Sequence, residues 1–180
     1  MKKGRSNIIL TGYMGSGKSS AGRLLSKKLK MSFADTDTLI EESQGRSIPQ
    51  IFGEDGEVYF RSCEHELLKK LAQDEDIKDT VIATGGGIVM DERNRGLLRS
   101  LGTVVYLRAD AGTLYQRVIN DNGRPLLDTD DKFQRIKDML SVRGPVYEEC
   151  ADIVVDTDVL DKEAVVNCVI SAWERRFSDL

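Results

Sequence analysis

The stretch that decides the fold of this chain is Gly12-Tyr13-Met14-Gly15-Ser16-Gly17-Lys18-Ser19, which fits G-x-x-x-x-G-K-[ST] at every fixed position. An apolar run at residues 8–10 precedes it and a helical pattern over residues 21–29 follows it. Glycines let successive backbone N–H groups turn towards an anion at the positive end of the helix. The pattern therefore predicts a strand, a phosphate-binding loop for a nucleoside triphosphate, and a helix.

The side chains of this loop suit a triphosphate and its metal ion. Lys18 would supply a cation to the β- and γ-phosphates, and the hydroxyl of Ser19 would ligate Mg²⁺. The loop residues that we expect to bind the nucleotide are Gly12, Gly15, Ser16, Gly17, Lys18, Ser19 and Ser20.

Outward from the loop, short apolar runs alternate with longer amphipathic stretches. The runs at residues 8–10, 81–83, 104–107 and 153–155 are continuous, which is typical of strands buried on both faces of a parallel sheet. Residues 32–34 form a shorter candidate strand, and the pattern at 57–72 predicts a helix. We expect Ser47, Asp91 and Asp161 to cap helices. The order indicates one α/β domain over residues 1–180, with helices on both faces of the sheet.

Composition narrows the class of protein. The 180 residues carry a formal net charge of −4, which argues against a general nucleic-acid binder. No apolar run approaches the ~20 residues of a membrane span, and none resembles the core of a signal peptide. The three cysteines have no metal-type spacing, which suits a reducing compartment. We therefore expect a cytoplasmic protein without membrane or nucleic-acid partners, and the lack of a long apolar surface stripe favours a monomer.

Acidic residues that could assist the metal follow the candidate strands. The chain has no Asn-Lys-x-Asp guanine motif, which argues against a GTPase. Asp156 follows the run at 153–155, as in a Walker B strand, but lies close to the C-terminus. Asp35 and Asp37 follow the shorter strand, and on an extended segment they would point the same way. One would hold Mg²⁺ through water and the other would meet an acceptor hydroxyl; alternatively, Asp37 only caps the next helix.

Two arginines and a run of glycines indicate the acceptor. Arg61 lies on the predicted helix with Glu64 at i+3, and Arg143 lies near the end of a later helix, just before Gly144-Pro145. Thr84-Gly85-Gly86-Gly87 ends a buried strand, where α/β sheets place ligands. Arginine pairs carboxylates bidentately, so the set predicts a hydroxylated carboxylic acid as substrate. Each arginine taken alone is more often a solvated surface charge, and only the combination favours a substrate site.

One polar segment, at about residues 120–131, interrupts the alternation. It is rich in turn-forming residues and carries Arg124. It is either a plain surface loop or a mobile lid that brings Arg124 to the phosphates.

In combination, these residues resemble the shikimate kinase family. The resemblance spans nearly the whole chain in the order of the family, including the phosphate loop, Asp35-Thr36-Asp37, residues 51–61, Thr84-Gly85-Gly86-Gly87, Arg124-Pro125-Leu126-Leu127, Arg143 with Tyr147-Glu148, and residues 151–157. The departure from the family pattern is Asp158-Val159-Leu160 in the adenine loop, which leaves adenine contacts beyond Arg117 open.

The resemblance implies a three-layer α-β-α kinase fold with a five-stranded parallel sheet and a mobile lid. It implies transfer of the γ-phosphoryl group of ATP, with Mg²⁺, to the 3-hydroxyl of shikimate. The catalytic residues would be Lys18, Asp37 and Arg124, and Asp35 would assist Ser19 at the metal. Arg117 would lie against adenine, and Glu64 would orient Arg61. The substrate-binding region, at about residues 35–62 with contributions from two later segments, would comprise Asp37, Phe52, Phe60, Arg61, Gly85, Gly86, Gly87 and Arg143.

Two other functions remain open at this point. A kinase for another hydroxy acid, such as gluconate, would use the same pair of arginines. A catalytically silent nucleotide-binding module would need the phosphate loop but neither the substrate arginines nor a lid. We expect His65, the single histidine, to be structural or solvated, because phosphoryl transfer of this type needs no imidazole base.

Overall fold

Five parallel strands form one sheet in the order β2-β3-β1-β4-β5 in the computed structural model, which describes residues 7–119 and 131–178. The strands are β1 (Ile8–Thr11), β2 (Ser32–Asp35), β3 (Thr80–Ala83), β4 (Thr103–Arg108) and β5 (Ile153–Asp156). The helices are α1 (Lys18–Leu29), α2 (Thr36–Gln44), α3 (Ile48–Glu54), α4 (Gly56–Gln73), the 3₁₀ helix η1 (Ile88–Met90), α5 (Glu92–Leu101), α6 (Ala111–Val118), α7 (Lys132–Cys150) and α8 (Lys162–Ser178). The predicted parallel α/β fold and its five strands are confirmed.

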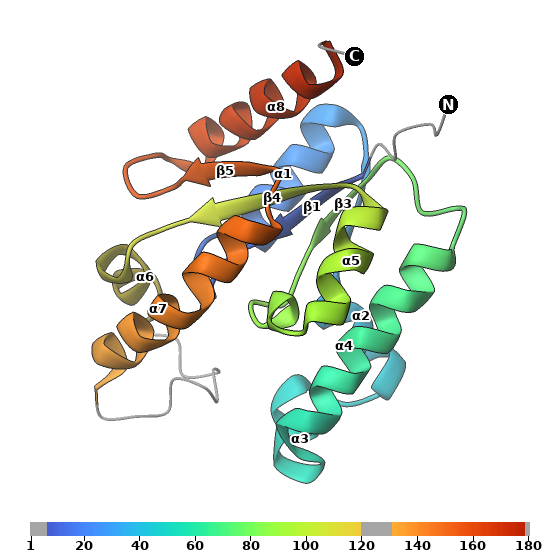
Figure 1. Cartoon of the computed structure of the whole chain (residues 1–180), viewed down its shortest axis with the longest axis vertical. Helices are drawn as coiled ribbons and strands as arrows, with labels where there is room; N and C mark the ends of the chain where they lie inside the picture. Colours follow the sequence, from blue (N-terminus) through green and yellow to red (C-terminus); the bar gives the residue numbers. More distant parts are fainter. Residues whose placement is uncertain (1–6, 120–130, 179–180) are drawn as a thin grey trace.

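Helices cover both faces of the sheet (Figure 1). Alternate residues of β1 point to opposite faces, so Ile8 and Leu10 enter one core and Ile9 enters the other. The first core lies under α1 and α8, which contact each other, and the second lies under α4, α5 and α7. The central strands β1, β3 and β4 are buried on both sides, as their continuous apolar runs predicted.

The edge strand β5 departs from that prediction. Its burial alternates along the strand, and the side chain of Val154 is 41% exposed. Because β5 pairs with β4 alone, its outer edge and part of one face remain open. A continuous apolar run was therefore an incomplete guide to burial at the edge of the sheet.

The predicted helix caps are confirmed. Ser47 begins α3 with a capping box to Gln50, Asp91 caps α5, and Asp161 Oδ1 accepts from the N–H of Ala164 in the first turn of α8. None of the helices in the two described ranges is both long and apolar enough to cross a membrane.

Helix α7 is longer than the sequence predicted. The prediction placed Arg143 near the end of this helix, before Gly144-Pro145, but α7 continues through Pro145 to Cys150. Proline removes one helical donor. Beyond it, Tyr147 and Cys150 are buried in the core under α7, so tertiary packing maintains the helix past its local break.

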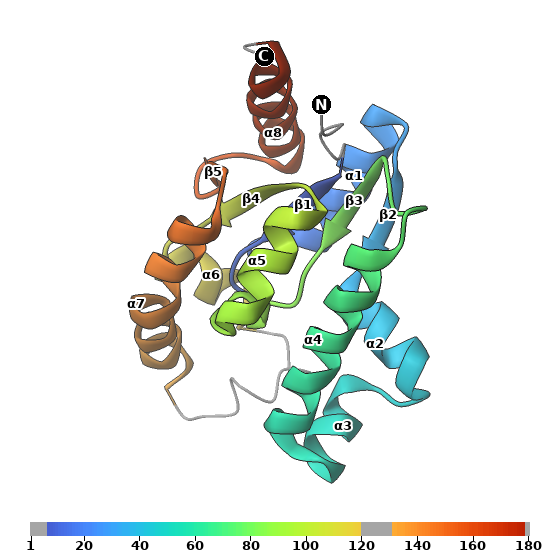
Figure 2. The same ribbon diagram turned by 45° about the vertical axis from the view of Figure 1, so that its right-hand side comes forward.

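A small helical layer projects from the carboxyl end of β2 (Figure 2). There α2, α3 and the start of α4 enclose Ile40, Ile51 and Phe60. These elements coincide with the predicted substrate-binding region at about residues 35–62. The predicted lid at about residues 120–131 lies almost wholly outside the described residues, Arg124 included; Asp131, its last residue, caps α7.

Candidate active site

The phosphate loop joins β1 to α1, and its lysine donates hydrogen bonds to main-chain carbonyls of the same loop. Gly17, the residue before α1, has a φ of 91°, which favours glycine, and Gly15 has a φ of 81°. The Lys18 ammonium is buried and donates to Gly12 O at 2.8 Å and to Tyr13 O at 2.9 Å. Beside the loop, a cavity of about 240 Å³ is lined by Gly15, Ser16, Gly17, Ser20, Arg117 and Thr157, among others. The geometry fits the anion-binding loop that the motif predicted.

The candidate metal ligands meet at the start of α1. Ser19 Oγ donates to Asp35 Oδ2 at 2.6 Å, from the end of β2. A hydroxyl and a carboxylate are a suitable pair for Mg²⁺, which takes few protein ligands alongside phosphates and water. Asp156, the alternative acidic residue, instead accepts from Arg108 Nε at 2.5 Å and Nη2 at 2.9 Å. The arrangement favours Ser19 and Asp35 as the metal ligands.

Asp37 occupies a different backbone position from the one predicted. It lies in the first turn of α2 and not on an extended segment, because the side chain of Asp35 caps this helix by accepting from the N–H of Asp37 at 3.1 Å. The alternative that Asp37 itself caps the helix is therefore wrong. Its Oδ1 is buried and has no hydrogen-bond partner in the described ranges. Burial raises the pKa of Asp37, as does the neighbouring Asp35 carboxylate, while Lys18 and Arg61 act in the opposite direction.

Gly85, Gly86 and Gly87 bring the other parts of the site together. The N–H of Gly85 donates to Thr36 Oγ1 at 2.9 Å. A Cβ on Gly85 would lie 2.8 Å from Asp37 Oδ1, and one on Gly87 would lie 2.5 Å from Arg61 Nη1. A Cβ on Gly86 would lie 3.4 Å from both Gly12 O and Met14 N in the phosphate loop. Glycine suits these three positions because the acidic, basic and phosphate-binding groups approach the backbone directly and leave little room for a Cβ.

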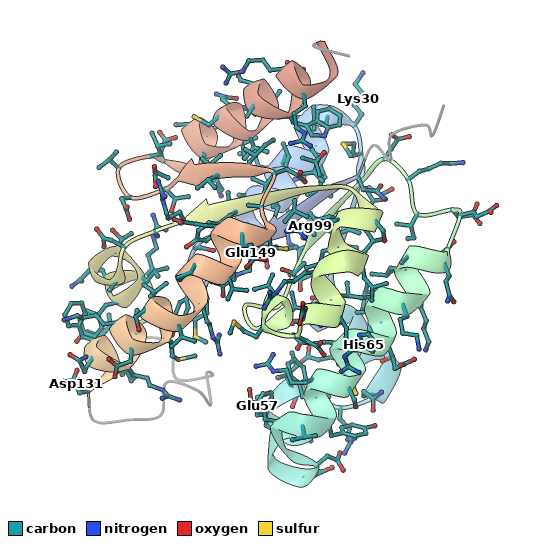
Figure 3. All side chains as sticks on the ribbon, in the orientation of Figure 1. Lys30, Glu57, His65, Arg99, Asp131 and Glu149 are labelled. Carbon is teal, nitrogen blue, oxygen red and sulfur yellow. The ribbon has the colours of Figure 1, made fainter. Side chains whose placement is uncertain are left out.

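Arg61 lies between two carboxylates on α4. Glu57 Oε1 accepts from Arg61 Nη2 at 2.8 Å, and Glu64 Oε2 accepts from Nη1 at 2.7 Å. Figure 3 marks Glu57 near the start of this helix. Glu64 is fully buried, its Oε1 has no partner among the residues described, and burial raises its pKa to about 7 against the opposing effect of Arg61. The Arg61 guanidinium also lies 5.4 Å from the centre of the Phe60 ring, which packs against Phe52 at 4.9 Å.

The second arginine approaches from α7. Arg143 lies over the ring of Tyr13, 5.9 Å from its centre, and its positive charge acts on Glu64. Arg117, on α6, donates to Thr157 Oγ1 at 3.1 Å, to Thr157 O at 2.8 Å and to Gly15 O at 3.4 Å. It therefore connects the loop after β5 to the phosphate loop. The predicted residues of the described chain thus gather at the carboxyl ends of the strands, where such sheets bind ligands.

Several contributing residues were missed from the sequence. Glu57 holds Arg61 and was signalled by the i, i+4 spacing. Thr36, which binds Gly85, and Tyr13, which packs under Arg143, carry no such local signal because their partners are distant in the chain. His65 has the predicted structural role, because its Nδ1 pairs with Asn94 Oδ1 at 2.8 Å between α4 and α5.

Several known proteins with similar sequences and structures are named shikimate kinase. The family model described as shikimate kinase matches residues 14–174. The shikimate kinase of Pseudomonas aeruginosa (strain LESB58) is 44% identical over 91% of this chain and 94% of its own. The structure of a shikimate kinase from Acinetobacter baumannii in complex with shikimate matches with a TM-score of 0.90 and 35% identity over 97% of this chain and 96% of its own. A gluconokinase from Sinorhizobium meliloti 1021 shares the fold, with a TM-score of 0.58 and 16% identity over 97% of this chain and 95% of its own.

Proposed function

This chain belongs to the shikimate kinase family, and on that premise we propose how its residues share the work of the reaction. The enzyme is an ATP-dependent kinase that acts on shikimate, and Mg²⁺ is the usual cofactor of the family. The acceptor is the 3-hydroxyl of shikimate. The single observation that carries the assignment of residues is the position of Gly85–Gly87, whose backbone is approached by Asp37, Arg61 and the phosphate loop at once.

On the nucleotide side, the loop residues from Gly12 to Ser20 bind the phosphates of ATP. Lys18 neutralises charge on the β- and γ-phosphates as the γ-phosphoryl group leaves; its contacts with Gly12 O and Tyr13 O keep the ammonium at the loop. Ser19 and Asp35 hold Mg²⁺, with Asp35 acting through water, and the ion supplies further charge neutralisation when bound. Arg117 lies against the adenine, next to Thr157.

On the acceptor side, Arg61, Arg143 and the glycine segment bind the carboxylate of shikimate, while Phe52 and Phe60 line its pocket. Asp37 accepts a hydrogen bond from the acceptor hydroxyl and takes its proton during the transfer. Its unpartnered buried Oδ1 and its raised pKa suit that role, because an acceptor oxygen is already free and more basic than an ordinary carboxylate. Glu64 orients Arg61 through the contact at 2.7 Å.

The remaining assignments concern the chain as a whole. Residues 1–180 form a single kinase domain, and the segment at about residues 120–131 closes as a lid that brings Arg124 to the phosphates. Closure of such a lid would exclude water, which otherwise competes with the hydroxyl as acceptor. The protein works as a monomer in the cytoplasm, without nucleic-acid or membrane partners.

The two alternative functions lack supporting observations. The likeness to the gluconokinase, at 16% identity, shows the fold alone and gives no support to gluconate as the acceptor. A silent nucleotide-binding module has no need for Asp37, Arg61 and Arg143 around one glycine segment. A coupled assay with ATP and Mg²⁺ tests this directly: shikimate should be phosphorylated and gluconate should not. A preference for gluconate, or no turnover of either acid, would reject the assignment.

The roles of the two arginines are tested by conservative replacement. Arg61→Lys and Arg143→Lys keep the charge but lose the planar fork that pairs with a carboxylate. Each should raise the KM for shikimate by about tenfold or more and leave the KM for ATP nearly unchanged. Arg135→Lys, on the exposed side of α7, is the matched control and should behave as the wild type.

A further inference from the structure

Tyr147 is buried in α7 one turn after Arg143, on the same face of the helix. Its side chain is 0% exposed, and its ring stacks on Tyr106 with ring centres 4.9 Å apart and planes inclined by 23°. Its hydroxyl donates to the main-chain carbonyl of Gly86, 61 residues earlier in the chain. A polar group this deep in the core is retained only where it is paired.

The positive charge of Arg143 also acts on this hydroxyl. Burial raises the pKa of Tyr147, and the positive charge of the Arg143 guanidinium lowers it. Burial outweighs this charge, so the pKa lies above its ordinary value and the hydroxyl keeps its proton. A tyrosine hydroxyl can donate once and still accept, so the hydroxyl that donates to Gly86 keeps a lone pair for the guanidinium of Arg143, one turn earlier on the same face of α7.

The bond to Gly86 orients more than one carbonyl. A peptide group is planar and trans, so the C=O of Gly86 and the N–H of Gly87 point in opposite directions from one plane. Holding the carbonyl towards α7 therefore fixes the direction of the Gly87 N–H. On its other side, Gly86 packs against Gly12 O and Met14 N, so the segment has little freedom to turn.

We propose that Tyr147 is a positioning residue for the substrate carboxylate, with one hydroxyl that holds Arg143 and the Gly86–Gly87 peptide in a single arrangement. The proposal rests on the proposed function, in which Arg143 and the glycine segment bind that carboxylate. Tyr147 itself is enclosed by protein and acts through these two groups. It supplies preorganisation, so its contribution belongs to substrate binding and not to the chemical step.

The test is Tyr147→Phe, which removes the hydroxyl and keeps the ring that stacks on Tyr106. We expect the KM and the calorimetric Kd for shikimate to rise by about tenfold, with kcat and the KM for ATP nearly unchanged. The methyl ester of shikimate, which lacks the carboxylate charge, should bind the variant and the wild type equally. Tyr106→Phe removes a hydroxyl from the stacked neighbour and should leave all of these quantities unchanged.

A double-mutant cycle separates positioning from general weakening of the fold. If Tyr147 acts through Arg143, the double variant should lose less binding free energy for shikimate than the sum of the losses caused by Tyr147→Phe and Arg143→Lys alone. Unchanged shikimate affinity in Tyr147→Phe, or strictly additive effects, would overturn the proposal while leaving the substrate site intact. Wild-type protein that binds the methyl ester as tightly as shikimate would overturn the carboxylate site itself, and the proposal with it.

Discussion

Arg61 and Glu64 form an asymmetric pair on α4: Arg61 Nη1 donates to Glu64 Oε2 at 2.7 Å, while Glu64 Oε1 is buried without a partner in the described part of the chain. The unpartnered oxygen faces Gly85, where Asp37 Oδ1 also lies. Glu64 is thus fully removed from water and lies next to a second carboxylate, while its bond to Arg61 and the charge of Arg143 only partly offset its burial. This imbalance makes the protonation of Glu64 sensitive to pH near neutrality.

We predict that loss of the proton from Glu64 lowers the free energy of unfolding as the pH rises. In the unfolded chain its carboxyl titrates near 4.5, and in the folded protein its pKa is about 7. Between these values the folded state binds more protons, so the free energy of unfolding should fall with increasing pH, by up to about 3 kcal/mol. In urea unfolding, the free energy of unfolding of Glu64→Gln relative to that of the wild type should be higher at pH 8 than at pH 5. Glu66→Gln, exposed on the same helix, is the control, and parallel pH profiles for Glu64→Gln and wild type would contradict the prediction.

Replacement of Asp37 should affect the chemical step. Asp37→Asn keeps the size of the side chain and its place in α2 but removes the basic oxygen, so kcat should fall by roughly 10² or more. Initial rates at saturating ATP and shikimate measure this, with Glu42→Gln, exposed on the same helix, as the control. A nearly normal kcat with a raised KM for shikimate would assign Asp37 to binding alone.

Loss of the Ser19 hydroxyl should change the requirement for metal. Ser19→Ala leaves Asp35 without its partner at 2.6 Å and removes one oxygen ligand. The Mg²⁺ concentration for half-maximal rate should rise by roughly tenfold or more. Titration of Mg²⁺ at fixed free ATP measures it, and Ser19→Thr should restore the wild-type curve because the motif accepts either hydroxyl. An unchanged Mg²⁺ curve for Ser19→Ala would remove Ser19 from the metal site.

A methyl group on Gly85 should be costly, whereas one on Gly96 should be favourable. The new Cβ of Gly85→Ala would lie 2.8 Å from Asp37 Oδ1 and Glu64 Oε1, which must move apart. We expect a loss of about 1–3 kcal/mol in stability together with a clear loss of kcat. Gly96 lies in α5 with nothing within 4 Å of the added group, so Gly96→Ala should gain about 0.5–1 kcal/mol with unchanged activity. Thermal unfolding and initial rates of both variants decide the matter.

The sequence correctly predicted those parts of the fold that are determined by consecutive residues. The motif from Gly12 to Ser19 and the apolar runs identified the phosphate loop and the central strands, because steric rules and burial act on consecutive residues. The turn at Asp35 was not predicted correctly. A short polar segment can extend a strand or begin a helix, and the cap formed by Asp35 on the N–H of Asp37 decides between them.

Other features depend on partners far along the chain. Pro145 is a local signal to end α7, and the buried Tyr147 overrides it through contacts with Gly86 and Tyr106. The predicted set of site residues included both arginines, but the supports of Arg143 at Tyr13 and Tyr147 became visible only in three dimensions. Spacing of i, i+4 is readable in one dimension, as for Glu57 and Arg61, whereas a bond across 61 residues is not.

The contact between Gly86 and the phosphate loop limits how the acceptor preference of this enzyme can evolve. Gly86 lies against Gly12 O and Met14 N, so a side chain introduced there to accommodate a new acceptor would also displace the loop for the phosphate donor. Mutations in the glycine segment would therefore weaken the binding of both the acceptor and the phosphate donor. Changes at Phe52 and Phe60, which pack with each other in the separate core of α2, α3 and α4, carry no such penalty. Divergence towards other acceptors should accordingly accumulate in that helical layer, while the glycines stay constant.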